Sequence, residues 1–581
     1  MSLIELGVRW LEAQGASWRP IDAALSRFVS ERTGSEALGW LAGLLSQAEG
    51  EGHSAIDLEQ LAREGCPLPT AECLQHPWVT RGDAMQPLVW RAPRLSSLRQ
   101  YRLEHAIAEA LRARLAAKPL DEAAQQPIAA TLERLFQGQD PRATQSARAA
   151  VMAALGTRLF VLSGGPGTGK TTTMARLLAC FCAHARALGY AEAPRLRLAA
   201  PTGKAAQRMR EALQAALPQL AAALADGPDG AAALATLAGV EPTTLHRLLG
   251  YRPHDGRYAH NVDDPLIADL VVVDEASMID LELMHALLQA LPERARLVLI
   301  GDAEQLSPVG VGSVFADLIG LREHPAMRQS VAVLEHVWRS EGALREAWRC
   351  LREEPGLFLD ALRSGAYGEA LQWEPVLDGG GLQNAVRRWF LRPEVRAART
   401  AMQQAAHAPV PALAALRQAQ LLCALRDGLA GVAGLNRLSA QIEGRIEGWH
   451  SGQPVILTAN DPARGLANGD MGVVYQHERR WRVRMATGEA EGREFAVADL
   501  PALVPADALT IHKAQGSEFN QVALVLPLEA SSRVLDRALL YTGATRARQG
   551  LCLIGSSAAL ERALQHQRGR VSQLPDLLGL D

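Results

Sequence analysis

One glycine-rich stretch limits what this chain can fold into more than any other part of it. Residues 164–171 read Gly-Gly-Pro-Gly-Thr-Gly-Lys-Thr, directly after the apolar run Leu159–Leu162 and before a helix-like segment. A glycine, four residues and then Gly-Lys-Thr, placed between a strand and a helix, is the phosphate-loop pattern. Its glycines let backbone N–H groups turn toward phosphate oxygens, and the helix adds its positive N-terminal end. The pattern predicts a nucleotide-binding α/β fold, against the alternative of a glycine-rich turn that carries a lysine by chance.

The loop residues have separate expected roles. Lys170 reaches the β- and γ-phosphates of ATP, and the Thr171 hydroxyl binds Mg²⁺. The residues expected to contact the nucleotide are Gly164, Gly165, Pro166, Gly167, Thr168, Gly169, Lys170, Thr171 and Thr172.

Length and composition set outer limits. The chain has 581 residues, which favours roughly three to four domains. Its 48% hydrophobic and 21% charged residues are typical of globular proteins. No apolar run approaches the ~20 residues of a membrane span, and Met1–Glu5 lacks the basic start of a signal peptide. We therefore expect a cytoplasmic protein with no membrane partner.

The cysteines and the net charge exclude few further classes of function. The seven cysteines are odd in number and scattered, which favours reduced thiols. Cys66, Cys73 and His76 lie near one another, but their spacing is not a familiar zinc spacing and no second pair follows. A net charge of −3 still allows a basic groove for nucleic acid.

The pattern of elements predicts an α/β chain with a helical N-terminal domain. Apolar residues recur three and four apart up to about residue 115, whereas residues 450–505 show short strands separated by turn residues. The expected division is a helical docking domain at 1–115, a linker at 116–140, a first phosphate-loop lobe at 141–330, a second lobe at 331–449 and 506–581, and a small β-barrel inserted at 450–505.

Two acids end a buried strand downstream of the loop. The β-branched run Leu270–Val273 leads into Asp274 and Glu275, and such a run is typical of a parallel strand that delivers its next residues to the site. Asp274 is expected to hold Mg²⁺ with Thr171, and Glu275 to orient or deprotonate the attacking water. Gln305, after the strand at 296–301, is expected to touch the γ-phosphate and the nucleic-acid path.

Three further side chains are candidates for the nucleotide. Gln145, 25 residues before Lys170, can read the adenine edge, since an amide both donates and accepts; the alternative is a surface glutamine. Arg339 and Arg546 can clamp the γ-phosphate from the second lobe, and surface salt bridges are the alternative for each. Gly516, in the stretch 508–519, is also placed beside the nucleotide.

The order of these motifs resembles that of superfamily 1 DNA helicases. The match runs from about 145 to 581 through the phosphate loop and the blocks 201–205, 244–246, 274–275, 301–305, 339, 510–518 and 541–546. Within superfamily 1B the blocks 444–455 and 468–472 are similar to the RecD family, the alpha subunits of RecBCD enzymes (exodeoxyribonuclease V).

The resemblance implies an ATP-dependent 5′-to-3′ DNA motor. It implies two RecA-like lobes, an SH3-like barrel, and RecB-like and RecC-like partners in a heterotrimer that acts in double-strand break repair and homologous recombination. Single-stranded DNA, reached from duplex ends, would contact Thr202, Lys204, His246, Thr510 and His512. We find no paired-carboxylate and lysine nuclease motif and expect no nuclease activity in this chain. A nucleotide-binding regulatory subunit without motor activity and a superfamily 1 RNA helicase remain the alternatives.

Overall fold

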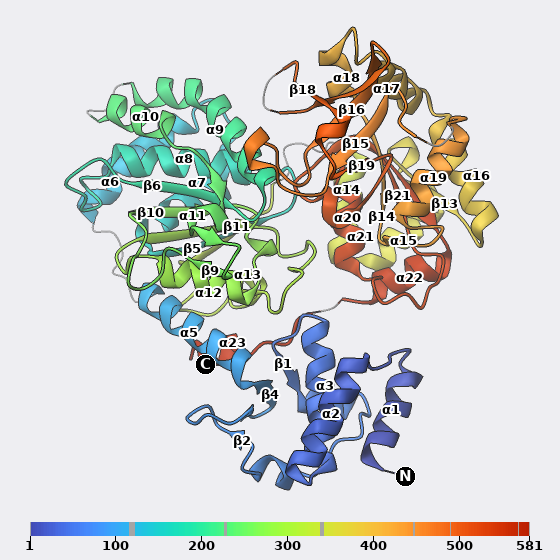
Figure 1. Cartoon of the computed structure of the whole chain (residues 1–581). Helices are drawn as coiled ribbons and strands as arrows, with labels where there is room; N and C mark the ends of the chain where they lie inside the picture. Colours follow the sequence, from blue (N-terminus) through green and yellow to red (C-terminus); the bar gives the residue numbers. More distant parts are fainter. Residues whose placement is uncertain are drawn as a thin grey trace.

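The computed structural model describes residues 2–115, 122–225, 229–336, 342–445, 448–487, 490–567 and 569–579. Figure 1 shows an N-terminal region below two larger lobes that stand side by side. Both lobes are built on parallel sheets, which confirms the expected α/β class.

The N-terminal region combines helices with a small sheet, where the sequence analysis expected helices. Within the described residues its strands pair in the order β1-β4-β3-β2. Val89 and Leu95 are fully buried on β3 and β4, and this burial holds the hairpin against the helices. The elements are α1 (Leu3–Ala13), α2 (Pro20–Thr33), α3 (Glu36–Gly50), β1 (Ala55–Asp57), α4 (Leu58–Arg63), a 3-10 helix (Ala71–Gln75), β2 (Val79–Thr80), β3 (Leu88–Arg91), β4 (Arg94–Ser97) and α5 (Leu98–Leu115).

We call the first sheet and its helices lobe 1. Among the described residues its six strands lie in the order β12-β5-β11-β10-β6-β7, and every pair is parallel. The strands are β5 (Leu159–Gly164), β6 (Leu196–Ala200), β7 (Thr243–Thr244), β10 (Leu270–Val273), β11 (Arg296–Gly301) and β12 (Val331–Leu334). The helices are α6 (Glu122–Leu135), α7 (Pro141–Gly156), α8 (Lys170–Ala183), α9 (Gly203–Leu224), α10 (Gly230–Ala238), α11 (Leu245–Leu248), a 3-10 helix (Ala276–Met278), α12 (Leu281–Ala290) and α13 (Val314–Gly320). The hairpin β8 (Tyr251–Arg252) and β9 (Arg257–Tyr258) follows α11.

Lobe 1 reaches beyond the residues that the sequence analysis gave it. Strand β12 pairs with β5, so the sheet continues past residue 330. Most of the expected linker 116–140 is also structured, because α6 buries Ile128 and Leu132 against α8 and α9. The apolar face of α6 explains why this segment folds onto the lobe.

Lobe 2 carries the second parallel sheet. Over the described ranges its five strands lie in the order β13-β22-β21-β14-β20. The strands are β13 (Leu371–Pro375), β14 (Ala419–Cys423), β20 (Ala508–Thr510), β21 (Phe519–Val525) and β22 (Ala547–Gly555). The helices are α14 (Ala343–Glu353), α15 (Pro355–Arg363), a 3-10 helix (Gly368–Ala370), α16 (Gly379–Phe390), α17 (Pro393–Gln403), α18 (Pro409–Ala415), α19 (Val432–Ile442), α20 (Ile511–Ala514), α21 (Arg537–Ala544) and α22 (Ser557–Gln565).

A small antiparallel sheet is inserted in lobe 2 between α19 and β20. In the part of the chain that the structure describes, five strands pair in the order β18-β17-β16-β15-β19. They are β15 (Gln453–Leu457), β16 (Met471–His477), β17 (Arg480–Met485), β18 (Arg493–Ala496) and β19 (Leu503–Pro505), with 3-10 helices at Pro462–Arg464 and Val497–Asp499.

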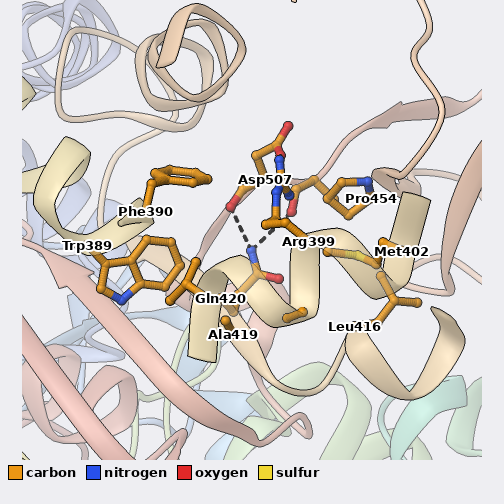
Figure 2. Close-up of a pocket in the computed structure, with 12 residues that line it drawn as sticks. Trp389, Phe390, Arg399, Met402, Leu416, Ala419, Gln420, Pro454 and Asp507 are labelled. Carbon is orange, nitrogen blue, oxygen red and sulfur yellow. Dashed lines mark hydrogen bonds and ion pairs between the residues drawn. The ribbon is translucent and has the colours of Figure 1, made fainter. Parts of the chain in front are cut away.

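A buried ionic cluster lies at the base of this insertion, where the chain leaves lobe 2 and returns to it. Figure 2 shows Arg399, from α17, next to Asp507, which precedes β20, and Gln420, which begins the buried part of β14. Gln420 Nε2 donates to the backbone carbonyls of Ala506 and Asp507, each at 3.0 Å, and Arg445 reaches the Asp507 carboxylate at 2.9 Å. The cavity between these residues is only about 10 Å³. It is a packed structural junction with no room for a ligand.

The last described residues leave lobe 2 and return to the start of the chain. We call residues 569–579 the C-terminal strap; it contains the short helix α23 (Leu574–Leu577). Figure 1 shows α23 beside α5, away from α22. The carboxylate of Glu104 accepts hydrogen bonds from the Ser572 hydroxyl at 2.7 Å and the Gln573 backbone N–H at 3.2 Å. The strap therefore ties the N-terminal region to lobe 1.

Cysteines and helices add two further observations. All seven cysteines are free thiols, and no group of three or more His, Cys, Asp or Glu residues in the described ranges could hold a metal ion. None of the described helices is both long enough and apolar enough to cross a membrane.

Candidate nucleotide site between the two lobes

The phosphate loop joins β5 to α8 through two glycines in the left-handed region. Gly167 has φ 76° and Gly169 has φ 85°, conformations that a side chain would strain. The Lys170 ammonium donates to the carbonyl of Gly164 and, at 3.0 Å, to that of Gly165. The lysine thus lies across its own loop, bonded to oxygens that phosphate oxygens can replace.

A cleft opens between this loop and lobe 2. Its volume is about 670 Å³, which is within the usual ~300–1,000 Å³ range of ligand sites. Lobe 1 contributes Pro166–Thr173, Asp274, Glu275 and Gln305, and lobe 2 contributes Arg546. Most of the expected nucleotide and catalytic residues therefore face one space, although Gly164 and Gly165 lie behind its lining.

The two acids leave the end of β10 side by side. The Asp274 backbone N–H donates to Ala199 of β6 at 2.9 Å, and the Glu275 N–H donates to the Asp274 carboxylate at 2.9 Å. Glu275 has φ 53°, a strained value for a residue with a side chain. Burial, and then the neighbouring charge of Glu275, raises the pKa of Asp274 above its ordinary value. Asp274 thus lies where a cation would be favoured.

Gln305 belongs to a contact between the lobes. Its Nε2 donates to the Asp302 carboxylate at 3.0 Å, and its side chain is almost fully buried. The next residue, Leu306, donates its backbone N–H to the hydroxyl of Thr542 on α21 at 2.8 Å. The loop after β11 that carries Gln305 is therefore attached directly to lobe 2.

Arg546 is fixed by the backbone of its own lobe. Its Nε donates to the Thr542 carbonyl at 3.0 Å and a terminal nitrogen donates to the Ser517 carbonyl at 3.3 Å. Only 3% of the residue is exposed, yet it lines the cleft. Arg339, its expected counterpart, lies outside the described residues.

Gln145 and Gly516 do not line the cleft. Gln145 is exposed on α7, whereas Thr144 beside it and Gln139 before it do line the cleft. Gly516 has φ 68° and forms the turn between α20 and β21, two residues before Glu518, which faces the cleft.

The site includes side chains that the sequence analysis missed. The Phe136 ring lies 4.0 Å from the guanidinium carbon of Arg176, and both residues line the cleft together with Gln139 and Arg208. Phe136 and Gln139 follow α6, and no short motif marks them. The position of Arg208, one turn beyond the Pro-Thr-Gly-Lys turn, was a usable signal.

The five expected DNA-contacting residues lie outside this cleft, at the N-termini of the helices α9, α11 and α20 that follow strands of the two sheets. Thr202 and Thr510 cap α9 and α20, each accepting a backbone hydrogen bond at 3.2 Å. His246 is exposed, and its ring centroid lies 5.3 Å from that of Tyr251. His512 is exposed on α20. Lys204 is half-buried, and burial, followed by the charges of Arg208 and Arg417, lowers its pKa to about 8.

Comparisons with known proteins place the chain in a family. The family model of the N-terminal domain of RecBCD enzyme subunit RecD matches residues 14–72, that of an AAA domain matches 147–311, and that of the UvrD-like helicase C-terminal domain matches 505–554. RecBCD enzyme subunit RecD of Mycolicibacterium smegmatis is 39% identical over 440 residues, which is 74% of each chain. The chain belongs to the RecD family. RecBCD enzyme subunit RecD of Mycobacterium tuberculosis (strain H37Rv) is 36% identical over 76% of this chain and 74% of its own.

Two more distant similarities complete the comparison of this RecD-family chain. The ATP-dependent RecD2 DNA helicase of Deinococcus radiodurans is 31% identical over 89% of this chain and 61% of its own. A solved structure of Bacteroides Pif1 bound to single-stranded DNA is 17% identical, covers 68% of this chain and 88% of its own, and has a TM-score of 0.37.

Proposed function

We propose that the chain is the ATP-dependent DNA helicase subunit of a RecBCD-type helicase–nuclease. One observation carries this proposal: Lys170, Thr171, Asp274, Glu275 and Gln305 from lobe 1 face Arg546 from lobe 2 across one cleft. A site between two lobes changes shape when the lobes move, so nucleotide turnover can drive motion.

The residues of the cleft fit MgATP. The Thr171 hydroxyl and the Asp274 carboxylate both line it, and hard oxygen ligands of this kind suit Mg²⁺. Burial and the charge of Glu275 raise the pKa of Asp274 although the charges of Lys170 and Arg208 oppose the rise, so a further cation beside this carboxylate would be favoured. Bound there, Mg²⁺ would neutralise charge on the phosphate oxygens.

The chain's own groups then divide the work of hydrolysis. Lys170 exchanges its loop carbonyls for phosphate oxygens, and Glu275 orients the attacking water. Arg546, already aligned by Thr542 and Ser517, stabilises the charge that develops on the γ-phosphate. Because Thr542 also bonds Leu306, the movement of Arg546 is linked to Gln305.

The remaining features of the proposal rest on the family. The motor moves 5′-to-3′ on single-stranded DNA that passes Thr202, Lys204, His246, Thr510 and His512. The two lobes are RecA-like, and the inserted sheet is an SH3-like module. The N-terminal region docks on a RecC-like partner, beside a RecB-like subunit. Polar groups at strand ends suit contacts to the DNA backbone, without base readout.

The alternatives are less well supported. A regulatory subunit that only binds nucleotide has no use for Glu275 in a strained conformation or for a buried arginine across the cleft. An RNA motor is separated from a DNA motor by comparing the stimulation of ATP hydrolysis by deoxyribose and ribose homopolymers.

The deciding experiment measures unwinding of matched duplexes that carry either a 5′ or a 3′ single-stranded tail, with the full chain and ATP. Unwinding from the 5′ tail alone supports motor and polarity together, and unwinding from the 3′ tail alone contradicts the polarity. If neither duplex opens although DNA stimulates hydrolysis, the motor needs its partner subunits. If DNA does not stimulate ATP hydrolysis, the proposal fails.

A further inference from the structure

Helix α9 presents one arginine to the nucleotide cleft. Ala205, Arg208, Met209 and Ala212 all line the cleft, and their spacing of three and four residues places them on one face of the helix. Arg210 lies on the same helix and does not line the cleft. Arg208 is therefore the cation that this face directs toward the phosphate loop.

The guanidinium of Arg208 has no acceptor among the described residues. No hydrogen bond or ion pair joins it to any residue that the structure describes. Burial lowers the pKa of Arg208, the charge of Glu518 opposes this effect, and the charge of Arg546 adds to it. A guanidinium offers five N–H donors, and those of Arg208 face the cleft, where a bound anion can accept them.

Positive charge collects around this position from both lobes. Arg417, Arg546 and Arg548 of lobe 2 line the same cleft, and Lys204 interacts electrostatically with Arg208. The acids that line the cleft beside them are Glu211, Asp274, Glu275 and Glu518, of which Glu518 is already bonded to Arg548. An anion of several charges, placed between Lys170 and Arg208, would satisfy the unbonded donors.

We propose that Arg208 is a phosphate-binding residue of lobe 1 that contacts the terminal phosphate of the nucleotide. The inference rests on the proposed function, since it names a further residue of the same site. It also gives α9 two roles: the helix begins at the expected DNA contacts Thr202 and Lys204, and it reaches the nucleotide one turn later. A shift of α9 caused by DNA would therefore move Arg208 relative to the phosphate loop.

The test compares Arg208→Gln with Arg208→Lys and with the matched control Arg210→Gln, all in the full chain. The affinities for MgADP and for a non-hydrolysable Mg–ATP analogue are measured together with DNA-stimulated hydrolysis and the thermal unfolding midpoint. We expect Arg208→Gln to lower the affinity for the Mg–ATP analogue about tenfold or more, as on loss of a charge-assisted hydrogen bond. The affinity for MgADP should change less than about twofold. The kcat should fall by about 10²-fold, as on removal of one group that stabilises transition-state charge.

The comparison of the two nucleotides decides the outcome, because a merely structural role would affect both alike. Arg208→Lys should lie between wild type and Arg208→Gln, and Arg210→Gln should resemble wild type. If Arg208→Gln lowers the affinities for both nucleotides equally, or behaves like the wild type, the inference is overturned and the motor assignment is unaffected. If Arg208→Gln does not fold, the ratio of the two affinities in Arg208→Lys decides in the same way. Loss of DNA-stimulated hydrolysis in the wild-type chain would instead overturn the proposed function.

Discussion

The phenolic oxygen of Tyr541, on α21 of lobe 2, lies 3.4 Å from a carboxylate oxygen of Asp302 in lobe 1. A β-carbon at Gly165 would lie 3.0 Å from the same hydroxyl. Burial, and then the charge of Asp302, raises the pKa of Tyr541 well above its usual value, so the hydroxyl stays protonated and donates. One hydroxyl therefore links lobe 2 to the carboxylate that positions Gln305, beside the phosphate loop.

Removing this hydroxyl should slow turnover with little effect on folding. Tyr541→Phe keeps the buried ring and deletes the donor to Asp302. We expect a several-fold fall in the kcat of DNA-stimulated ATP hydrolysis and a change of only ~1 kcal/mol in the free energy of unfolding. Steady-state kinetics and thermal unfolding measure the two effects. An unchanged kcat would mean that the contact only supports packing.

Lys170→Gln should abolish DNA-stimulated ATP hydrolysis and leave the fold intact. The ammonium supplies charge to the phosphates, whereas in this structure its hydrogen bonds go to two carbonyls of its own loop, so the fold does not depend on that charge. Circular dichroism and the thermal unfolding midpoint check the fold. Near-normal turnover in this variant would refute the ATPase assignment.

DNA affinity should fall as pH rises from 7 to 9. The pKa of Lys204 is lowered to about 8, so its charge is present below that pH and lost above it. A protein with a neutral amine at this position releases fewer counterions from the DNA when it binds. Both the DNA affinity and its dependence on salt therefore decrease. Lys204→Arg, which stays charged, should flatten the pH profile measured by fluorescence anisotropy with a single-stranded oligonucleotide. An equal pH dependence in both proteins would assign the effect to another group.

Asp507→Asn should destabilise lobe 2 at neutral pH. Burial would raise the pKa of Asp507, but the charges of Arg399 and Arg445 outweigh it and hold this pKa below its ordinary value. A carboxylate with a lowered pKa contributes stability above its unfolded pKa, and loses it as pH falls through the folded pKa. Glu443 still pairs with both arginines in this variant, but the loss of one buried charge partner should cost about 3 kcal/mol.

The pH dependence of the wild-type and variant unfolding midpoints checks this origin. Their difference should be constant from pH 8 to 5 and shrink only in stronger acid. A difference that vanishes already at pH 6 would point to a titrating group other than Asp507.

Deleting the C-terminal strap should loosen the N-terminal region and spare the nucleotide site. The strap buries Leu574 and Leu578 in the core of lobe 1 and bonds Glu104 on α5, and none of these residues lines the nucleotide cleft. Hydrogen exchange in α5 should rise in a chain that ends at residue 567, while nucleotide affinity stays at the wild-type value. Weakened nucleotide binding would show instead that the strap supports the cleft.

The sequence predicted the parts of the site that local motifs encode. Lys170, Asp274 and Arg546 each follow from a short pattern at a strand or helix end, and all three face the cleft. Gln139 and Phe136 could not be found this way, because the packing of α6 on α8 and α9 brings them there. The two parallel sheets were also predictable, since buried parallel strands read as continuous apolar runs.

Long-range pairing was beyond the reach of the sequence analysis. The small sheet of the N-terminal region depends on β1 pairing with β4, although α4, a 3-10 helix, β2 and β3 separate these strands in the sequence. The strap depends on hydrogen bonds between residues more than 450 positions apart. Neither the β1–β4 pairing nor the hydrogen bonds of the strap depend on residues close together in the sequence, so composition and periodicity could not predict them.

The C-terminal strap has a consequence for the order in which the chain matures during synthesis. Glu104 leaves the ribosome early, but its partner Ser572 is 468 positions later. Burial raises the pKa of Glu104 in the folded chain, where Ser54, Ser572 and Gln573 donate to its carboxylate; before the strap is made, Ser54 is the one donor of these three that is present. Lobe 1 and the N-terminal region can collapse as they emerge and pack α5 on α12, yet the contacts of the strap with both form only after lobe 2 has been made. A chain whose synthesis stops before the strap would keep the packing of α5 on α12 but lack the hydrogen bonds that the strap makes to Glu104.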